Sequence, residues 1–424
     1  MNKDNVIGLK NIVETELKDA LTDLIRNAAH KAINDAVALE VKDFIESLSH
    51  LKLEDGKQQV VRNGYHPERQ VATGIGKVAV KLPKVRDRNS TGIKFHSLLI
   101  PPYMRRAKSI DELLPLLYLQ GISTNHFQQA LEPMLGKGAK NVSASVISGL
   151  KTKWDGELKQ WQNRSLSGKE YVYWWVDGIY LKSRMESEKT CILVIMGATK
   201  EGKKELIAFN DGFRESTASW LELLRDMKRR GLSISPKLAI GDGAMGFWSA
   251  LEKEFPMVKQ QRCWVHKTAN ILNKLPKSIQ SHAKSKLHNI YMAPNKAMAE
   301  VAYKEFISTY EIKYPKATHC LTKDKEVLFS FYDFPAEHWG HIRSTNAIES
   351  TFATIQHRTR QARGCYSRGT ILSAFFKMAM EAEKSWMKLR GHKRLAEVMD
   401  MVKFIDGISE REIDKIKQDE QNAA

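Results

Sequence analysis

The chain has 424 residues, enough for two to four domains with sizeable buried cores. Hydrophobic residues make up 42% of it and charged residues 27%, which excludes a largely disordered or low-complexity protein. Its 67 basic residues exceed its 49 acidic residues and give a formal net charge of +18. That surplus favours a polyanionic partner, first nucleic acid and second an anionic membrane surface.

The sequence shows no sign of membrane insertion or export. No run approaches the roughly 20 apolar residues that a membrane-spanning helix needs. The first residues carry acids where a signal peptide has its apolar core. A disulfide framework is not expected either, because the few cysteines are far apart and form no C-x2-C pair. We therefore expect a cytoplasmic, nucleoid-associated protein without a membrane segment.

The first predicted element is a helical segment over residues 1–58. Apolar residues such as Leu17, Leu21 and Leu24 recur there at spacings of three and four, which is the period of an amphipathic helix. We interpret this segment as a helix for docking or for dimerisation. The alternative is a helix that packs into the core of its own chain.

Residues 59–106 are predicted to form strands, because glycines and prolines interrupt any helix there. In VATGIGKVAVKLPKVRDR, apolar residues alternate with basic ones, as in a strand with one charged face. We interpret the segment as a basic ribbon that contacts DNA phosphates. The alternative is a solvated edge hairpin. The candidate DNA contacts are Lys81, Lys84, Arg105 and Arg106.

Residues 107–165 are predicted to be a helix-turn-helix-like module of short helices with tight glycine turns. Its last helix begins with small polar residues in NVSASVISGLKTKW. We expect Ser143 and Ser145 to face bases and Lys151 and Lys153 to face phosphates. The alternative is a plain helical bundle that links its neighbours.

Residues 166–267 alternate between strand and helix. The first strand is YVYWWV, a continuous apolar run typical of a strand buried on both faces. Two more strands, a helix, a strand, a second helix and a short fifth strand follow, an order that indicates a mixed α/β sheet. Residues 268–340 lack strand signals and are predicted to be all-helical. Residues 341–395 are helical again, and residues 396–424 form a polar tail or loosely held helix.

Three acidic residues stand out by their context. Asp177 directly follows YVYWWV and Asp242 directly follows the strand KLAI, each beside a glycine that allows a ligand to approach closely. Carboxylates on neighbouring strands repel each other unless a cation or a proton holds them. Mg²⁺ prefers oxygen ligands and keeps waters for substrate phosphates. Glu349, at the start of a basic helix, is the best candidate for a third ligand.

Such a site suits two-metal phosphoryl transfer on a DNA phosphodiester. Water attacks first and frees a 3′-hydroxyl, which then attacks another phosphodiester. We therefore predict that Asp177, Asp242 and Glu349 are catalytic and hold two Mg²⁺ ions, which Mn²⁺ can replace. Each acid also has a purely structural interpretation, because Asp-Gly is a common turn dipeptide and Glu349 follows Asn346 at capping-box spacing.

Two further groups lie close in sequence to these acids. Cys263 and His266 form a C-x2-H pair, which is only half of a zinc site. We expect them beside the active site, where they shape it or contact DNA; otherwise they are a buried cysteine and a hydrogen-bonded histidine. The helix after Glu349 is rich in arginine, which binds phosphate through paired hydrogen bonds. Its candidate DNA contacts, if this is more than a solvated face, are Arg358, Arg360, Arg363 and Arg368.

The sequence resembles transposases of the Mutator-related group, the bacterial insertion sequence 256 family. The resemblance rests on four motifs in family order, namely VDGIYLKSR, IGDGAMGFWSALEKEFP, QRCWVHKTANILNKLP and RSTNAIESTFATIQHRTRQARG. It covers roughly residues 60–390, and the first 50 residues match least well. The combination is specific, although each motif alone is weak.

This resemblance implies an α/β fold with an RNase H-like catalytic core, interrupted by an all-helical insertion and preceded by helical N-terminal DNA-binding modules. Position by position, the family's DDE triad falls on Asp177, Asp242 and Glu349, and its C-x2-H motif on Cys263 and His266. The resemblance also implies binding of double-stranded DNA, namely the element's terminal inverted repeats and the target. A homodimer or higher oligomer on that DNA is expected.

Three functions compete at this point. The favoured one is a Mg²⁺-dependent DDE transposase that cleaves and transfers DNA strands. The second is a non-catalytic DNA-binding regulator derived from a transposase, which would bind DNA ends without nicking them. The third is a structure-specific nuclease, which would cut strands but never join them. The intact acidic triad favours the transposase.

Overall fold

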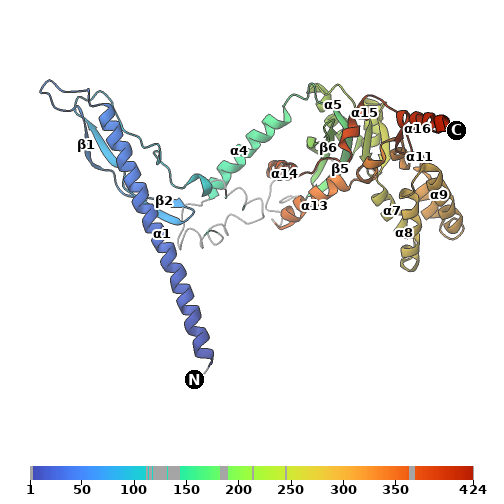
Figure 1. The fold of residues 1–424 in the computed structure, drawn as a ribbon, viewed down its shortest axis with the longest axis horizontal. Helices are drawn as coiled ribbons and strands as arrows, with labels where there is room; N and C mark the ends of the chain where they lie inside the picture. Colours follow the sequence, from blue (N-terminus) through green and yellow to red (C-terminus); the bar gives the residue numbers. More distant parts are fainter. Residues whose placement is uncertain are drawn as a thin grey trace. The chain divides into compact units, whose positions relative to one another are not determined.

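The chain divides into two compact units, Met1–Leu150 and Lys151–Ala424, each with its own hydrophobic core. Figure 1 shows the elements of both units as they occur in the computed structural model. The residues whose structure is described are 3–110, 113, 117, 131, 144–181, 190–212, 214–243, 246–361 and 368–423.

The first unit is a long helix packed against antiparallel strands. β1 pairs with β4, and β2 pairs with β3, so the segment contains two small ribbons. The strands lie along the C-terminal half of α1, whose N-terminal half continues beyond them (Figure 1). The elements are α1 (Lys3–Ser47), β1 (Val60–Tyr65), β2 (Arg69–Thr73), β3 (Gly76–Val80) and β4 (Pro83–Asp87).

The predicted alternation of apolar and basic residues in these ribbons is confirmed. Val78 and Val80 are buried against Val37 of α1, whereas Lys81 and Lys84 are exposed. Burying one face of each ribbon on the helix stabilises strands that would be marginal alone. Of the helix-turn-helix-like segment that follows, most lies outside the described residues. Its described part includes α4 (Ala144–Gln162).

The second unit contains a five-stranded mixed sheet in the order β7-β6-β5-β8-β9. β5, β6 and β7 form an antiparallel meander, and β8 and β9 add in parallel beside β5. The predicted sequence of strands and helices is confirmed. Its elements are β5 (Tyr171–Leu181), β6 (Thr190–Thr199), β7 (Lys204–Gly212), α5 (Thr217–Arg229), β8 (Leu238–Gly241), α6 (Phe247–Glu254) and β9 (Lys259–Arg262).

Two element boundaries differ from the prediction. β5 does not end before Asp177 but continues to Leu181, because this stretch pairs with β6 across the glycine at position 178. The fifth strand, predicted over VKQQRCWVH, is also shorter than that run. It ends at Arg262, and Cys263 is the N-cap residue of the helix that follows.

Helices cover both faces of this sheet. On one face, α5 buries an apolar stripe in the core that it shares with α6, namely Trp220, Leu223, Leu224 and Met227. The Ser216 side chain caps this helix by accepting a hydrogen bond from the Ser219 N–H at 3.2 Å. α13 (Asn346–Gln361) contacts β5, and α14 (Arg368–Glu383) contacts β7.

The segment 268–340 contains helices and no strand, as predicted, and the structure describes all of it. α8 and α9 lie side by side, away from the sheet (Figure 1). The segment begins within α7 and ends within α12. Its elements are α7 (Trp264–Leu272), α8 (Lys277–Tyr291), α9 (Lys296–Tyr310), α10 (Pro315–Thr322), α11 (Lys325–Leu328), η2 (Ser330–Asp333), η3 (Ala336–His338) and α12 (Trp339–Ile342).

Of the two predicted forms of the C-terminal segment, a polar tail or a loosely held helix, the structure shows a helix. A short hairpin precedes its last helix, and that helix is anchored by hydrogen bonds from Arg394 and Ser409 to Glu412. Within the described ranges, no helix is long and apolar enough to span a membrane. The elements are η4 (His392–Arg394), α15 (Leu395–Met399), β10 (Phe404–Ile405), β11 (Ile408–Ser409) and α16 (Glu410–Ala423).

A buried histidine joins the sheet to this C-terminal segment. The side chain of His338 is fully buried; its Nε2 lies 2.9 Å from the Gly391 carbonyl oxygen, and its Nδ1 lies 2.8 Å from the Tyr173 hydroxyl. Because a carbonyl only accepts, Nε2 donates to it and Nδ1 accepts from the tyrosine, which describes a neutral imidazole. Burial lowers the pKa of His338 to about 4.

We expect acid to destabilise the second unit through this histidine. Below pH 6.5 the unfolded chain protonates His338, whereas the folded chain does so only near pH 4, so protonation favours unfolding. The contribution of neutral His338 to the free energy of unfolding is fully present above pH 6.5 and is lost as the pH falls to 4. The change in that free energy is about 3 kcal/mol. Urea unfolding followed by tryptophan fluorescence measures this, because all nine tryptophans lie in the second unit. His338→Gln should flatten the dependence, whereas His319→Gln, at an exposed position, should not.

Candidate active site

The sheet places two of the predicted acids at equivalent positions on neighbouring parallel strands. Trp175 of β5 is opposite Ile240 of β8, and Asp177 and Asp242 each come two residues later. β8 has ended at that point, whereas β5 continues alongside β6. Asp177 is therefore open on the side that β8 leaves free, and Asp242 begins the loop at the same end of the sheet.

Glu349 reaches this end of the sheet from a helix. It lies in the first turn of α13, which packs against β5. Its carboxylate accepts a short hydrogen bond from the Thr345 hydroxyl and lies 3.6 Å from His266 Nδ1. The alternative interpretation, a capping box formed by Asn346 and Glu349, is not among the described contacts, in which the Glu349 carboxylate accepts from Thr345. The structure thus brings the three predicted acids to one region of the second unit.

The pKa of Asp177 is shifted by the neighbouring carboxylates and by burial. Burial, aided by the negative charges of Glu215 and Glu349, raises the pKa of Asp177 to about 7, against a hydrogen bond from the Gly178 N–H. The positive charge of His266 opposes this shift only in part. A cation bound there would therefore stabilise the ionised form of the Asp177 carboxylate.

A fourth carboxylate, Glu215, was not predicted from the sequence. A Cβ atom at Gly178 would lie 2.4 Å from Glu215 Oε1, so glycine is needed there for the carboxylate to approach β5. Burial raises the pKa of Glu215, and the charge of Asp242 adds to that effect, whereas a hydrogen bond with Tyr180 opposes it. Glu215 directly precedes the helix cap at Ser216, and nothing in that local pattern distinguishes it from a loop residue.

The C-x2-H pair lies beside Glu349, at the start of α7. The Sγ of Cys263 accepts a hydrogen bond from the Thr345 N–H at 3.3 Å and lies 3.2 Å from the Thr345 hydroxyl oxygen, whose proton goes to Glu349. Ligand atoms of Cys263, His266 and Glu349 all lie within 4.8 Å of one another. A hydrogen bond with Cys263, together with the charges of Cys263, Asp242 and Glu349, raises the pKa of His266 to about 9. The histidine is thus a cation next to the acids.

Arg262 lies beside Asp242 and Asp324. Its Nη2 lies 4.0 Å from Asp242 Oδ1 and 3.5 Å from Asp324 Oδ2. Its buried guanidinium lies directly over Gly243, where a Cβ would be 1.3 Å from Cζ. The Gly243 N–H donates to Asp242 Oδ1 at 2.6 Å, and the Trp248 indole donates to the Asp242 carbonyl at 2.7 Å. Asp242 is therefore held through both backbone and side chain.

Comparison with known proteins identifies the family of the chain. A family profile described as "Transposase, Mutator family" matches residues 1–389. The chain belongs to the Mutator family of transposases. The match includes the first unit and all four carboxylates of the site.

Named relatives of this Mutator-family chain are insertion-sequence transposases. It is 52% identical over 288 residues to the transposase for IST2 from Acidithiobacillus ferrooxidans, covering 66% of this chain and 95% of that one. The transposase for IS6120 from Mycolicibacterium smegmatis is 50% identical over 277 residues, covering 65% and 85%. The transposase for IS256 in transposon Tn4001 from Staphylococcus aureus is 30% identical over 357 residues, covering 83% and 87%. The predicted resemblance to the insertion sequence 256 family is confirmed.

A solved structure was also matched, at a much lower level. It is a cryo-EM structure of the simian T-cell lymphotropic virus intasome in complex with PP2A regulatory subunit B56 gamma. The match has 14% identity and a TM-score of 0.17, and it covers 31% of this chain and 52% of that one. A likeness this small carries no argument about the fold of the Mutator-family chain.

The predicted DNA-contacting residues of this Mutator-family chain are spread over both units. Lys81, Lys84 and Arg105 are exposed on the ribbons and the loop that follows them, and Arg106 is half-buried. In α4, Lys151 is half-buried, and Lys153 is exposed and 4.0 Å from Glu157. Ser143 and Arg363 lie outside the described residues. The remaining candidates lie in α4, α13 and α14, namely Ser145, Arg358, Arg360 and Arg368.

Proposed function

We propose that this chain is a DDE transposase that binds the terminal inverted repeats of its insertion sequence and carries out Mg²⁺-dependent DNA cleavage and strand transfer. The single observation that carries this proposal is that Asp177, Asp242 and Glu349 all lie within electrostatic reach of His266, beside the end of the β5–β8 pair. Family membership supports the class of reaction, because the named relatives are transposases of insertion sequences.

The side chains at this site fit Mg²⁺ by the chemistry of their donor atoms. Asp177, Asp242 and Glu349, with Glu215 beside them, offer hard carboxylate oxygens, which Mg²⁺ prefers. The softer Sγ of Cys263 already accepts a hydrogen bond from the Thr345 N–H and lies against the Thr345 hydroxyl. We therefore assign the ions to the carboxylates and a supporting role to the C-x2-H pair. Bound Mg²⁺ would lower the pKa of an attacking water and neutralise charge on the phosphoryl oxygens.

The protein's own part in the reaction is to hold the carboxylates in place. Arg262 and the Gly243 N–H fix Asp242, while the Thr345 hydroxyl orients Glu349. The positive charge of His266 lies next to Glu349 and offsets part of the negative charge of the site. Preorganised donors and charges of this kind cost no reorganisation when the reaction occurs.

The wider architecture extends this proposal. Residues 166–395 would form an RNase H-like core, supported by a sheet of three antiparallel strands followed by two parallel ones. The helices over 268–340 would be an insertion into that core. The exposed lysines and arginines of the first unit would bind DNA phosphates, supported by the net charge of +18. A homodimer or higher oligomer on paired ends is part of the same proposal.

One experiment tests the function directly. Purified full-length protein is incubated with labelled DNA that carries the element's ends, with Mg²⁺, with Mn²⁺ or with EDTA, and the products are mapped by sequencing gel. We expect nicks that leave a 3′-hydroxyl at the element end, followed by joined products, in both metals and not in EDTA. End binding without any metal-dependent nick would contradict the proposal and favour a regulator. Nicks without joined products would favour a nuclease.

A further inference from the structure

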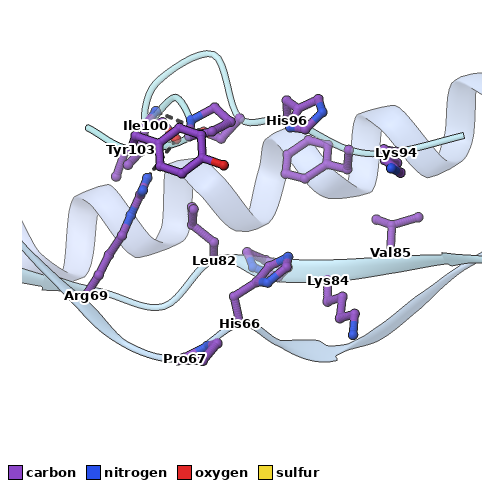
Figure 2. A pocket seen from close by; sticks show the side chains of 14 residues that line it. His66, Pro67, Arg69, Leu82, Lys84, Val85, Lys94, His96, Ile100 and Tyr103 are labelled. Atoms are coloured by element: carbon purple, nitrogen blue, oxygen red, sulfur yellow. Dashed lines mark hydrogen bonds between the residues drawn. The ribbon is translucent and has the colours of Figure 1, made fainter. Parts of the chain in front are cut away.

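A cavity far in sequence from the carboxylates occurs within the first unit. It has a volume of about 530 Å³ and lies between the ribbon of β1 and β4 and the loop over residues 93–103. Figure 2 shows side chains from the ribbon and from the loop facing each other across it. This volume is within the range of roughly 300–1,000 Å³ that is typical of small-molecule sites.

The lining of the cavity combines apolar surface with positive charge. Leu82, Val85 and Phe95 belong to an apolar wall that also contains several prolines. Basic side chains surround it, and none of the described lining residues is acidic. Lys84 and Lys94 are exposed and form no ion pair with any carboxylate in the described part of the chain. The basic residues of the lining are His66, Arg69, Lys84, Lys94 and His96.

Hydrogen bonds hold the loop wall in place without a ligand. Arg69 Nη2 donates to the carbonyl oxygens of Ile100 at 3.2 Å and Pro101 at 2.8 Å. The Glu40 carboxylate of α1 accepts from the Leu98 N–H at 3.1 Å and the Leu99 N–H at 3.2 Å. A cavity whose walls are already ordered loses little conformational entropy when a ligand binds.

The mouth of the cavity presents an aromatic ring to solvent. Tyr103 is 92% exposed, and its φ of +67° is in the left-handed region, which is unfavourable for a non-glycine residue. Such strain persists only where the surroundings impose it, and it is concentrated at ligand sites. Tyr103 and Arg69 lie at one end of the cavity in Figure 2, with Lys84 and Lys94 toward the other. The buried Nε of Arg69 has no hydrogen-bond partner within the described ranges.

We infer that this cavity binds one nucleotide of a DNA strand whose base is unstacked from its neighbours. The base would lie against the apolar wall and the Tyr103 ring, since aromatic side chains stack on any base. The flanking phosphates would be bound by Lys84 and Lys94. A ligand here must join a planar apolar body to negative charge, and a nucleotide does both. The inference deepens the proposed function, because it assumes that DNA is the partner.

The test compares two labelled single strands of about 12 nucleotides, one carrying bases and one built of abasic residues, by fluorescence anisotropy with the full-length protein. We expect Tyr103→Ala to weaken binding of the base-carrying strand by about five-fold to a hundred-fold, the range for one stacked base. The abasic strand should bind Tyr103→Ala and the parent equally. Replacing Lys84 and Lys94 together by Ala should weaken binding of both strands.

Tyr65→Ala is the matched control, because this tyrosine is also exposed on the ribbon but does not line the cavity. It should leave the difference between the two strands unchanged. An equal effect of Tyr103→Ala on both strands, or no effect on either, would overturn the inference and leave the cavity to another class of ligand. Because the readout is binding and not cleavage, a failure of the proposed chemistry remains separate from a failure of this inference.

Discussion

Replacing Asp177 by Asn is expected to reduce strand cleavage and joining on the order of a thousand-fold or more while DNA affinity stays within about two-fold. The side chain keeps its shape but loses the charge through which it would hold a cation. Asp242→Asn and Glu349→Gln should behave in the same way. The measurement is the rate of product formation on labelled end DNA with Mg²⁺, alongside equilibrium binding to the same DNA.

The variant should also remain folded, which separates loss of chemistry from loss of structure. Burial and neighbouring negative charges raise the pKa of Asp177, so the ionised carboxylate is unfavourable in the folded chain without a cation. Asp177→Asn should therefore unfold at no lower urea concentration than the parent. Asp400→Asn, at an exposed position in the same unit, is the matched control and should retain full activity. Parent-level cleavage by Asp177→Asn would remove this residue from the mechanism.

Gly243→Ala is expected to lower the cleavage rate about ten-fold to a hundred-fold without unfolding the chain. The added methyl would lie 1.3 Å from Cζ of Arg262, so the guanidinium must move away. The guanidinium is buried between Asp242 and Asp324. Moving it takes its positive charge away from the Asp242 carboxylate. Single-turnover cleavage of end DNA measures the loss.

The control for this substitution is Gly340→Ala, where an added Cβ would meet no atom within 4 Å. It removes a glycine from the same unit and should leave the cleavage rate unchanged. If Gly243→Ala cleaves as fast as the parent, the contact between Arg262 and Asp242 does not matter for the reaction. A large fall in the urea midpoint of Gly243→Ala would instead assign Gly243 a structural role.

Much of the second unit could be predicted because its signals are local. The run YVYWWV is typical of a buried strand, and the spacing of the apolar residues from Trp220 to Met227 is typical of one face of a helix. The end of β5 was placed too early because Asp177 and Gly178 form a typical turn dipeptide. Pairing with β6 overrides that local preference and carries the strand on to Leu181.

The surroundings of the acids could not be predicted, because they depend on tertiary contacts. Glu215 follows a strand and precedes a helix cap, and only the fold brings it against Gly178. Thr345 joins Glu349 to Cys263 through one hydroxyl, a connection between residues more than 80 positions apart for which the sequence carries no signal. The cavity in the first unit could not be predicted either, because its walls come from separate turns and strands, none of which carries a signal of its own.

Metal binding by the full-length chain tests the central claim most directly, because it reports on the carboxylates without depending on cleavage. Mn²⁺ is titrated into the protein with end DNA present, and the free ion is followed by electron paramagnetic resonance. We predict that the parent and Asp400→Asn bind Mn²⁺ at the site, that Mg²⁺ displaces it, and that Asp177→Asn and Asp242→Asn bind it at least about ten-fold more weakly. Equal Mn²⁺ binding by all four proteins would contradict the account.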